Sequence, residues 1–339
     1  MDNTFFQSYK IEDRSYVSFV KREIHNLTAQ AGFSPMRAGE IDIIVSELTS
    51  NLIKHTTGGE LIYRLDGIDS NRAFEIYCID NGPGTNDIGR MMKDGASSAN
   101  TLGHGLGSIN RLSDQFQIYS MNNWGTVAYS KSYRQPPVKS FNRNKEQLYH
   151  KILQVCMPGE RVCGDGVYLK KIADQTHIFL GDGLGHGVHA FEAVQKAIEA
   201  FMLCTDNEPV EALRFIHHHV KKTRGLVATV LIVDHVRHTM KVCGVGNITT
   251  RFYQGLTSRN YMPYNGILGL NIPGTMNALE IEEEKHQCIV MFSDGIRSRV
   301  DLGKYPSILK YDPAIIASAI FKDNARRNDD MTVFVGRIN

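Results

Sequence analysis

The sequence lacks every long apolar run that a membrane span requires. None of its hydrophobic stretches approaches the ~18–20 consecutive apolar residues of a transmembrane helix, and the best candidate lies near Ala314–Phe321. The first residues contain no basic segment followed by an apolar run, so we expect no secretory signal. These absences predict a cytoplasmic protein that does not contact membranes.

An excess of charge of either sign is also missing. The 339 residues include 38 Lys and Arg against 36 Asp and Glu, which gives a formal net charge of +2. No region has the concentrated basic face that binding to a phosphate backbone requires, and this disfavours contact with nucleic acid. A hydrophobic share of 42% and a charged share of 22% are ordinary for globular domains. The length favours two of them.

Paired cysteines are absent as well. The six cysteines are scattered, with no CxxC pair, and without an export signal we expect them to be reduced and mostly buried. Three consecutive histidines, His217–His219, lie in a helical pattern. Neighbours on a helix point about 100° apart, so these three side chains cannot converge on one metal ion.

A basic segment with prolines divides the chain. Residues 134–147 include RQPPVKSFNRNK, which has two consecutive prolines, no apolar periodicity and several positive charges. This composition is typical of a linker. It predicts a first domain over residues 1–133 and a second domain over residues 148–339.

The first domain begins with helical patterns and continues with strand patterns. Apolar spacing predicts one helix over Asp13–Ala31 and a second that starts at Ser34–Pro35, with Ser34 as its N-cap. Strands are predicted at Glu60–Leu65, Ala73–Ile79, Phe116–Ser120 and Thr126–Tyr133. We therefore expect an α+β sandwich in which two helices pack on a mixed sheet.

Runs of β-branched residues dominate the second domain. Strands are predicted at Val167–Ile172, Thr176–Leu180, Val227–Val233, Met240–Val245, Gln287–Phe292 and Met331–Arg337. Helices are predicted near Val188–Leu203, Pro209–Lys222 and Pro313–Lys322. Many strands with a few helices between them suggest two packed antiparallel sheets with the helices outside.

Polar side chains share one face of the second helix. Glu47, Asn51 and His55 follow one another at steps of four residues, which places them on the same side. Alone, this is most often the solvated face of an amphipathic helix. Two features downstream favour a functional interpretation. The turn Asp80–Gly84 (DNGPG) follows a strand directly, and the glycine-rich loop Gly103–Gly107 precedes a short helix, where backbone N–H groups can approach a polyphosphate.

In this order, SELTSNLIKH (Ser46–His55), DNGPG, GHGLGSINRLSDQF (Gly103–Phe116) and Gly125–Thr126 resemble the GHKL (HATPase) superfamily, and within it the RsbT-like anti-sigma-type serine kinases. The resemblance implies a GHKL α/β sandwich that binds ATP and Mg²⁺. Glu47 would be the catalytic base for the substrate hydroxyl, and Asn51 would hold Mg²⁺ on the ATP phosphates. The nucleotide would be bound by Asn51, Asp80, Gly82, Gly84, Gly103, Gly105, Gly107 and Thr126, with Asp80 and Thr126 at the adenine amino group. A histidine kinase would need a phosphoacceptor histidine on a long hairpin before the ATP domain, and only His25 precedes the second helix.

Aspartates recur at strand ends in the second domain. They stand in Gly164–Gly166 (GDG), Gly181–Gly183 (GDG), Ser293–Gly295 (SDG) and Asp329–Asp330 before the last strand. A single Asp-Gly is most often a hairpin turn. Four such sites, each beside a β-run, predict carboxylates gathered at one edge of a β-sandwich, which is an oxygen-rich site suited to Mg²⁺ or Mn²⁺.

These segments, with GDGLGHG (Gly181–Gly187) and DDMT (Asp329–Thr332), resemble the type 2C metal-dependent protein phosphatases of the SpoIIE branch. GVGN (Gly244–Asn247) makes the compact RsbX-like form the nearest. The resemblance implies a β-sandwich flanked by helices and hydrolysis by water without a covalent phosphoenzyme. Two Mn²⁺ or Mg²⁺ ions would be held by Asp165, Asp182, the Gly183 carbonyl, Asp294 and Asp329. Asp182 would bridge the ions, Asp330 would orient its neighbour, and Arg161 is a candidate for gripping the phosphate.

The two resemblances together predict a bifunctional partner-switching enzyme. It would phosphorylate and dephosphorylate a serine or threonine on a STAS-domain protein, either an anti-anti-sigma factor or a stressosome-type scaffold, and homodimerisation stays open. One alternative is a phosphatase with an ATP-binding regulatory head that lacks kinase activity. Another is a non-catalytic switch that docks on a sigma factor, another regulator or another phosphatase.

Overall fold

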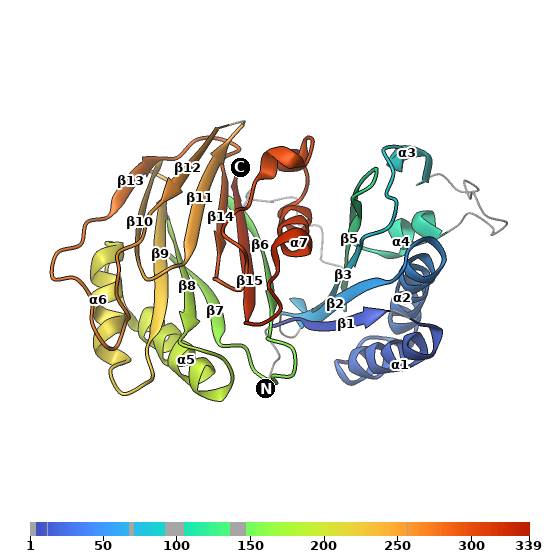
Figure 1. Cartoon of the computed structure of the whole chain (residues 1–339), viewed down its shortest axis with the longest axis horizontal. Helices are drawn as coiled ribbons and strands as arrows, with labels where there is room; N and C mark the ends of the chain where they lie inside the picture. Colours follow the sequence, from blue (N-terminus) through green and yellow to red (C-terminus); the bar gives the residue numbers. More distant parts are fainter. Residues whose placement is uncertain (1–4, 12, 68–70, 92–104, 136–146, 256) are drawn as a thin grey trace. The chain divides into compact units, whose positions relative to one another are not determined.

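The computed structural model of the chain describes all residues except 1–4, 12, 68–70, 92–104, 136–146 and 256 (Figure 1). It divides into two compact units, Met1–Phe141 and Asn142–Asn339. Most of the predicted linker, residues 136–146, lies outside the described residues. In the part that the structure describes, no helix is long and apolar enough to cross a membrane.

The first unit packs helices against one five-stranded sheet in the order β1-β2-β3-β5-β4. Its elements are β1 (Gln7–Ile11), α1 (Arg14–Gln30), α2 (Pro35–His55), β2 (Gly59–Asp66), β3 (Ala73–Asp80), α3 (Ile88–Met91), α4 (Gly105–Leu112), β4 (Gln115–Met121) and β5 (Gly125–Tyr133). The predicted strands and the two long helices are confirmed. The short helix begins earlier than predicted, at Gly105 inside the glycine-rich loop, and the predicted mixed sheet is wrong. Every neighbouring pair is antiparallel, because β4, which runs parallel to β3, pairs only with β5 at the edge of the sheet.

Helix α2 buries one face and leaves its polar face available. Ser34 caps its N-terminus, where the hydroxyl accepts a hydrogen bond from Arg37 N at 3.2 Å. The buried core that α1, α2 and the sheet share includes Ile24, Ile41, Val45, Leu48, Leu52, Leu61, Phe74 and Ile76. Apolar burial of this kind is worth roughly 25 cal/mol per Å² removed from water. It fixes the rotation of α2, so Glu47 and Asn51 stay half-buried beside the start of α4.

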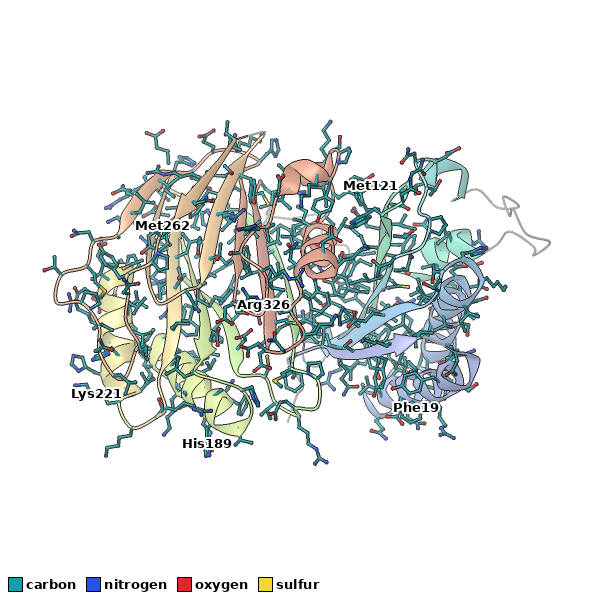
Figure 2. The ribbon with its side chains drawn as sticks, viewed as in Figure 1. Phe19, Met121, His189, Lys221, Met262 and Arg326 are labelled. Atoms are coloured by element: carbon teal, nitrogen blue, oxygen red, sulfur yellow. The ribbon has the colours of Figure 1, made fainter. Side chains whose placement is uncertain are left out.

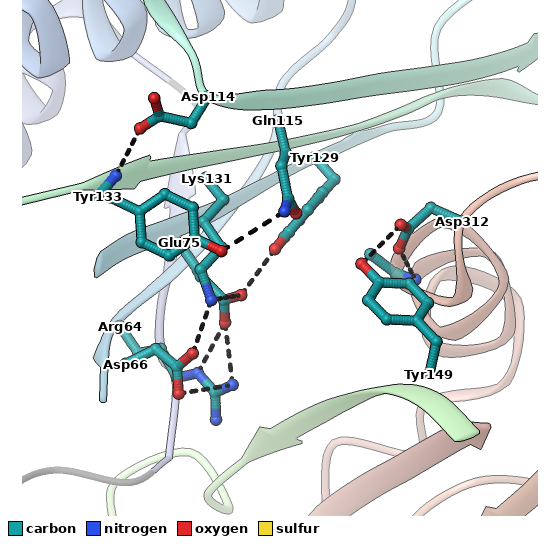
Figure 3. A network of polar contacts seen from close by, with 11 residues as sticks. Arg64, Asp66, Glu75, Asp114, Gln115, Tyr129, Lys131, Tyr133, Tyr149 and Asp312 are labelled. Atoms are coloured by element: carbon teal, nitrogen blue, oxygen red, sulfur yellow. Dashed lines mark hydrogen bonds and ion pairs between the residues drawn. The ribbon is translucent and has the colours of Figure 1, made fainter. Parts of the chain in front are cut away.

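A charged cluster is built into the same sheet (Figure 3). Glu75 on β3 is only 1% exposed. Its carboxylate accepts hydrogen bonds from Arg64 Nη2 at 2.9 Å and from Tyr129 OH at 2.6 Å, and Lys131 Nζ lies 3.1 Å away. Burial alone would lower the pKa of Lys131, but Glu75 and Asp66 raise it to about 12. Lys131 therefore stays charged at neutral pH.

Removing Glu75 is expected to destabilise the first unit strongly. In Glu75→Ala, Arg64 and Lys131 stay buried without the carboxylate between them, and breaking a buried pair in this way costs about 3–5 kcal/mol. The matched control is Asp66→Asn, whose carboxylate is 35% exposed and whose loss should cost no more than about 1 kcal/mol. Urea unfolding of both variants measures the difference, and equal losses would contradict the expectation.

The second unit is a sandwich of two antiparallel five-stranded sheets, as predicted. The sheet orders are β13-β10-β9-β8-β7 and β12-β11-β14-β15-β6. The strands are β6 (Leu148–Val155), β7 (Asp165–Ile172), β8 (Gln175–Gly183), β9 (Leu226–Asp234), β10 (Thr239–Val245), β11 (Thr249–Gln254), β12 (Thr257–Tyr261), β13 (Leu279–Glu282), β14 (Cys288–Phe292) and β15 (Met331–Ile338). The helices are α5 (Val188–Leu203), α6 (Pro209–His219), α7 (Pro313–Asn324) and the short 3-10 turns η2 (Leu302–Lys304) and η3 (Ile308–Lys310).

Apolar layers hold this sandwich together. Ile178 and Leu231 from one sheet meet Met291 and Phe334 from the other in a shared core. Helices α5 and α6 cover the outer face of the first sheet, and α7 covers the second (Figure 1). The packing brings the end of β8 and the start of β7 close to the end of β14 and the start of β15. All six cysteines are unpaired, and all but the half-buried Cys156 are buried.

Candidate functional site

The turn after β3 brings four of the predicted nucleotide-binding residues together. Asp80 Oδ1 accepts hydrogen bonds from Gly82 N at 2.7 Å and from Thr126 N at 3.2 Å. The Thr126 hydroxyl lies 3.0 Å from the Ser120 hydroxyl, which also donates to Gly125 O at 2.9 Å. The Asp80 carboxylate is therefore held in a fixed orientation at the end of its strand.

Gly84 fits this turn because it has no side chain. Its φ is +63°, and a Cβ there would lie 1.8 Å from Met121 O, so only glycine lets the turn close against the β4–β5 hairpin. The backbone bond from Asn123 N to Pro83 O, at 2.7 Å, closes the same contact. The turn after β3 and the β4–β5 hairpin thus form one rigid corner around Asp80.

Glu47 and Asn51 form a second group, one helical turn apart on α2. A Cβ at Gly105, the first residue of α4, would lie 2.9 Å from Glu47 Oε2 and 3.9 Å from Asn51 Oδ1. The start of α4 therefore lies directly over Glu47, the predicted catalytic base, and Asn51, the predicted Mg²⁺ ligand. Gly107 is buried within α4. Gly103, also predicted to bind nucleotide, lies outside the described residues.

The end of α2 connects the two groups. A Cβ at Gly82 would lie 2.7 Å from Thr56 Cγ2 and 3.3 Å from His55 O. The Asp80 turn therefore packs on the last turn of the helix that carries Glu47 and Asn51, whereas the His55 side chain is exposed. The fixed Asp80 carboxylate at one end of this region suits a nucleobase. The Asn51 amide and the Glu47 carboxylate at the other end suit a phosphate chain with its metal ion.

The variant Gly84→Ala tests this corner. We expect it to lower the stability of the first unit by at least about 1–3 kcal/mol, because the new side chain combines a left-handed backbone with a backbone clash. Weaker ATP binding should accompany the loss, because the Asp80 turn is displaced. Gly39→Ala, in an open position on α2, is the matched control and should gain about 0.5–1 kcal/mol. Thermal unfolding and calorimetric ATP titration measure both, and an unaffected Gly84→Ala would contradict the role of the turn.

The second group of predicted residues meets where the two sheets of the second unit approach each other. Asp165 opens β7 and pairs directly with Asp182 at the end of β8. Asp294 follows β14, and Asp329 with Asp330 precede β15. Ser293 ties the sheets together at this point, since its hydroxyl donates to Asp165 Oδ2 at 2.6 Å and accepts from Thr332 N at 3.1 Å.

The carboxylates lie close enough to perturb one another. Burial, and then the negative charges of Asp165, Asp294, Asp329 and Asp330, raise the pKa of Asp182 well above its ordinary value. Burial also raises the pKa of Asp165 to about 7, against the hydrogen bond from Ser293 that lowers it. Burial and Asp329 raise the pKa of Asp294, whereas a hydrogen bond from Asn247 and the positive charge of Arg326 lower it.

This carboxylate cluster fits a divalent cation. Asp165 Oδ1 is buried with no hydrogen-bond partner, and within the described ranges none of the five carboxylates forms an ion pair with Lys or Arg. Carboxylates that interact electrostatically and form no ion pair with Lys or Arg are the kind of oxygen ligand that Mg²⁺ and Mn²⁺ prefer. Gly183 lies where a side chain has no room, because a Cβ there would lie 2.5 Å from Ala190 O on α5. Its N–H donates to Gly164 O at 2.9 Å and so ties the end of β8 to the residue before β7.

The Asp330 carboxylate faces the loop between β6 and β7. Its two carboxylate oxygens accept hydrogen bonds from Met157 N and Gly164 N, both at 2.8 Å. Its backbone N donates to Asp329 Oδ1 at 2.9 Å. Asp330 therefore anchors the segment before Asp165 and orients Asp329. Arg161, the predicted phosphate ligand, is exposed on this segment and stays a prediction.

The sequence did not single out the residues that support the cluster. Besides Ser293, Asn247 Nδ2 donates to Asp294 Oδ2 at 2.9 Å, and Gln154 Nε2 donates to the Asp165 carbonyl at 2.6 Å. Ser293 and Asn247 each stand in a glycine-containing turn, SDG and GVGN, which is a weak signal. Gln154 lies inside β6 and has no pattern of its own.

The raised pKa values predict that the metal-free second unit loses stability as pH rises. A carboxyl group whose pKa is higher in the fold than in the unfolded chain stabilises the fold while it is protonated. For Asp165, with a pKa of about 7 against an ordinary value of about 3.9, this contribution disappears as pH rises from about 4 to about 7.

Thermal unfolding of the full chain from pH 5 to pH 8 measures this effect. In EDTA the melting temperature is expected to fall with pH, and saturating Mn²⁺ should remove most of the fall because the cation neutralises the cluster. A melting temperature that rises with pH in EDTA would contradict the crowding of carboxylates.

Comparison with known proteins gives a separate match for each unit. A family model described as a histidine kinase-like ATPase domain matches residues 12–129, and one described as stage II sporulation protein E (SpoIIE) matches residues 173–339. The serine/threonine-protein kinase RsbT of Bacillus subtilis (strain 168) is 31% identical over 101 residues, which cover 30% of this chain and 76% of that kinase. The phosphoserine phosphatase RsbX of the same strain is 24% identical over 199 residues, which cover 57% of this chain and 96% of that phosphatase.

One similar solved structure comes from work described as "The bacterial stressosome: a modular system that has been adapted to control secondary messenger signaling". The alignment covers 57% of this chain and 100% of that chain, with 27% identity and a TM-score of 0.52.

Proposed function

We propose that this chain phosphorylates and dephosphorylates a partner protein. Over its first unit the chain belongs to the histidine kinase-like ATPase family, in the RsbT-like branch. Over its second unit it belongs to the SpoIIE phosphatase family, in the RsbX-like branch. The first unit phosphorylates a serine or threonine of a partner protein with ATP, and the second unit removes that phosphate. Two observations support the proposal: Gly105 packs on Glu47 and Asn51 in the first unit, and the aspartates of the second unit interact electrostatically.

In the first unit, phosphoryl transfer needs positioning, charge neutralisation and an acceptor for the hydroxyl proton. The Asp80 corner binds the base of ATP, and the start of α4 lies over the phosphates. Glu47 accepts the proton of the substrate hydroxyl. Asn51 would hold the Mg²⁺ that accompanies ATP, and this ion would neutralise phosphate charge.

In the second unit, Asp165, Asp182, Asp294 and Asp329, with the Gly183 carbonyl, would hold two Mn²⁺ or Mg²⁺ ions. Such ions supply charge neutralisation for a phosphoryl group and make water more acidic. The residues of the chain keep this centre rigid. Asp330 fixes the segment that leads to Asp165, Ser293 fixes the Asp165 side chain, and Asn247 fixes Asp294.

The partner we infer is a STAS-domain protein of the stressosome or anti-anti-sigma type. RsbT, RsbX and the stressosome structure, to which the two units are similar, support this class. A phosphoserine carries about −1.5 to −2 charges, enough to disrupt a packed interface. The balance of the two activities would therefore set which complexes the partner can join.

A label-transfer experiment tests the proposal. The full chain is incubated with γ-labelled ATP, Mg²⁺, Mn²⁺ and a purified STAS-domain protein, in parallel with Asp294→Asn, which silences the second unit. Label should accumulate on the STAS protein with Asp294→Asn and should be released when the unmodified chain is added. No transfer of label, together with hydrolysis of p-nitrophenyl phosphate, would leave a phosphatase with an ATP-binding head. If p-nitrophenyl phosphate is not hydrolysed either, a non-catalytic switch is left.

A further inference from the structure

Next to the carboxylate cluster, the second unit has a surface cavity of about 680 Å³, lined by Arg297, Ser298, Arg299, Lys304, Asp323, Asn324, Arg326 and Asn328. Four of its eight lining residues are cations, namely Arg297, Arg299, Lys304 and Arg326, and all four side chains are exposed. Arg326 is labelled in Figure 2. Among the residues that the structure describes, none of the four forms an ion pair.

The one carboxylate in the cavity does not neutralise these cations. Tyr305 OH donates to Asp323 Oδ2 at 2.7 Å, and Lys322 Nζ lies 3.4 Å from Asp323 Oδ1. Both oxygens of Asp323 thus already have partners outside the cationic set. The cavity therefore presents a local excess of positive charge, which attracts carboxylate or phosphate groups. Arg326 also acts on the neighbouring cluster, where its charge lowers the pKa of Asp294.

The cavity is connected rigidly to the predicted metal centre. One wall begins at Arg297, three residues after Asp294, and the other ends at Asn328, immediately before Asp329. Two backbone hydrogen bonds join the walls: Arg326 N donates to Gly295 O at 2.8 Å, and Arg297 N donates to Asn324 O at 2.9 Å. Arg251 on β11 supports the first wall from behind, where its guanidinium donates to the carbonyls of Ser298 and Val300.

We propose that this cavity is the docking site for acidic residues that flank the phosphorylated serine or threonine of the substrate protein. The inference rests on the proposed phosphatase function. The reacting phosphate belongs at the carboxylate cluster, and the cavity lies beside that cluster in the same two loops. Its volume exceeds that of a single phosphate group, and three of its four cations are arginines, whose planar guanidinium pairs with a carboxylate through two parallel hydrogen bonds.

The docking site would select substrates by the charge next to the phosphoserine. The cluster at the centre is itself negative, so an acidic substrate segment needs a separate positive surface to approach it. Arg297 and Arg326, on the two walls, would receive the residues nearest to the phosphoserine, and Arg299 and Lys304 those farther along. Charge complementarity of this kind acts mostly on association, so it weakens as salt rises.

Two synthetic phosphoserine peptides test the proposal with the full chain and Mn²⁺. One has glutamates on both sides of the phosphoserine, and the other has glutamines at the same positions. We expect kcat/KM to be about tenfold higher for the acidic peptide at low salt, with the ratio falling towards one at high salt. The double variant Arg299→Glu with Lys304→Glu should remove this preference. The double variant Lys222→Glu with Lys285→Glu, at two exposed lysines outside the cavity, makes the same change in charge and should keep it.

A binding measurement separates the docking site from catalysis. Fluorescence anisotropy with the acidic peptide that carries serine in place of phosphoserine should show binding to the wild type and about tenfold weaker binding to the double variant. Binding without phosphatase turnover would support the docking site and overturn the proposed function. Turnover of both peptides at equal kcat/KM, or a preference that survives in the double variant, would overturn the docking site and leave the phosphatase function standing.

Discussion

Asp182→Asn is expected to abolish phosphatase activity and at the same time to make the metal-free chain more stable. The loss of turnover on p-nitrophenyl phosphate should exceed about 100-fold, because changes in groups that only support metal ligands already cost 10–100-fold. Asp182 pairs with Asp165 across β7 and β8. Four carboxylates repel its charge, namely those of Asp165, Asp294, Asp329 and Asp330. Asparagine keeps the shape of the side chain and removes one of the charges.

The stability gain is measured in EDTA at pH 7.5. In a unit of this size each kcal/mol of relieved repulsion raises the melting temperature by about 2–4 °C. Asp174→Asn, at the opposite end of the same β7–β8 hairpin and exposed, makes the same chemical change away from the cluster and should alter neither quantity. A variant at position 182 that keeps wild-type turnover would remove Asp182 from the centre. A lower melting temperature would mean that its charge stabilises the fold.

Glu47→Gln is expected to reduce phosphoryl transfer to the partner by about 10²–10⁴-fold, which is the usual contribution of a positioned general base. Glutamine keeps the packing of α2 against Gly105 but cannot accept the proton of the substrate hydroxyl. ATP binding should therefore be unchanged, because Asp80 and Asn51 keep their places. Single-turnover label transfer in the Asp294→Asn background measures the rate, and calorimetry measures ATP affinity.

The control for this experiment is Glu23→Gln on α1, which makes the same substitution at an exposed position. It should transfer label at the wild-type rate. If Glu47→Gln also transfers label at the wild-type rate, another group accepts the proton. If it loses ATP binding together with transfer, Glu47 acts in assembling the nucleotide site and its assignment as the base is contradicted.

Strong local patterns made most of the fold predictable. Helix α2 combines an N-cap serine, a first-turn proline and an apolar stripe, and the structure confirms its start at Pro35. Strand β1 was missed because five residues near the chain start make a strand only by pairing with β2. Strand β12, TSRNY, was missed because four of its five residues are exposed and polar. In the first unit the sequence also failed to predict that all neighbouring strands are antiparallel, since this depends on which strands become neighbours.

The residues of the candidate sites also fall into two groups, those that the sequence predicted and those that only the folded structure reveals. Motif spacing indicated Glu47, Asn51, Asp80 and the aspartates of the cluster, because aspartate and glycine at strand ends leave a repeated signature. The positions of Ser293 and Gln154 depend on how two sheets meet, and a serine or glutamine leaves no periodic trace. The cationic cavity combines residues from two segments that are distant in the sequence. Hydrogen bonds that no sequence pattern predicts, such as those from Arg326 N to Gly295 O and from Arg297 N to Asn324 O, bring the segments together.

The direct pairing of Asp165 with Asp182 has a consequence for handling the protein. Strand β7 is the outermost strand of its sheet, and it opens with a carboxylate that faces another carboxylate. When metal ions are removed, the repulsion between Asp165 and Asp182 acts on the start of β7, the end that the β7–β8 turn does not hold. An outer strand that frays there offers unpaired N–H and C=O groups to other chains. We therefore expect purification in chelating buffers to favour aggregation, and divalent salts to keep the preparation monodisperse.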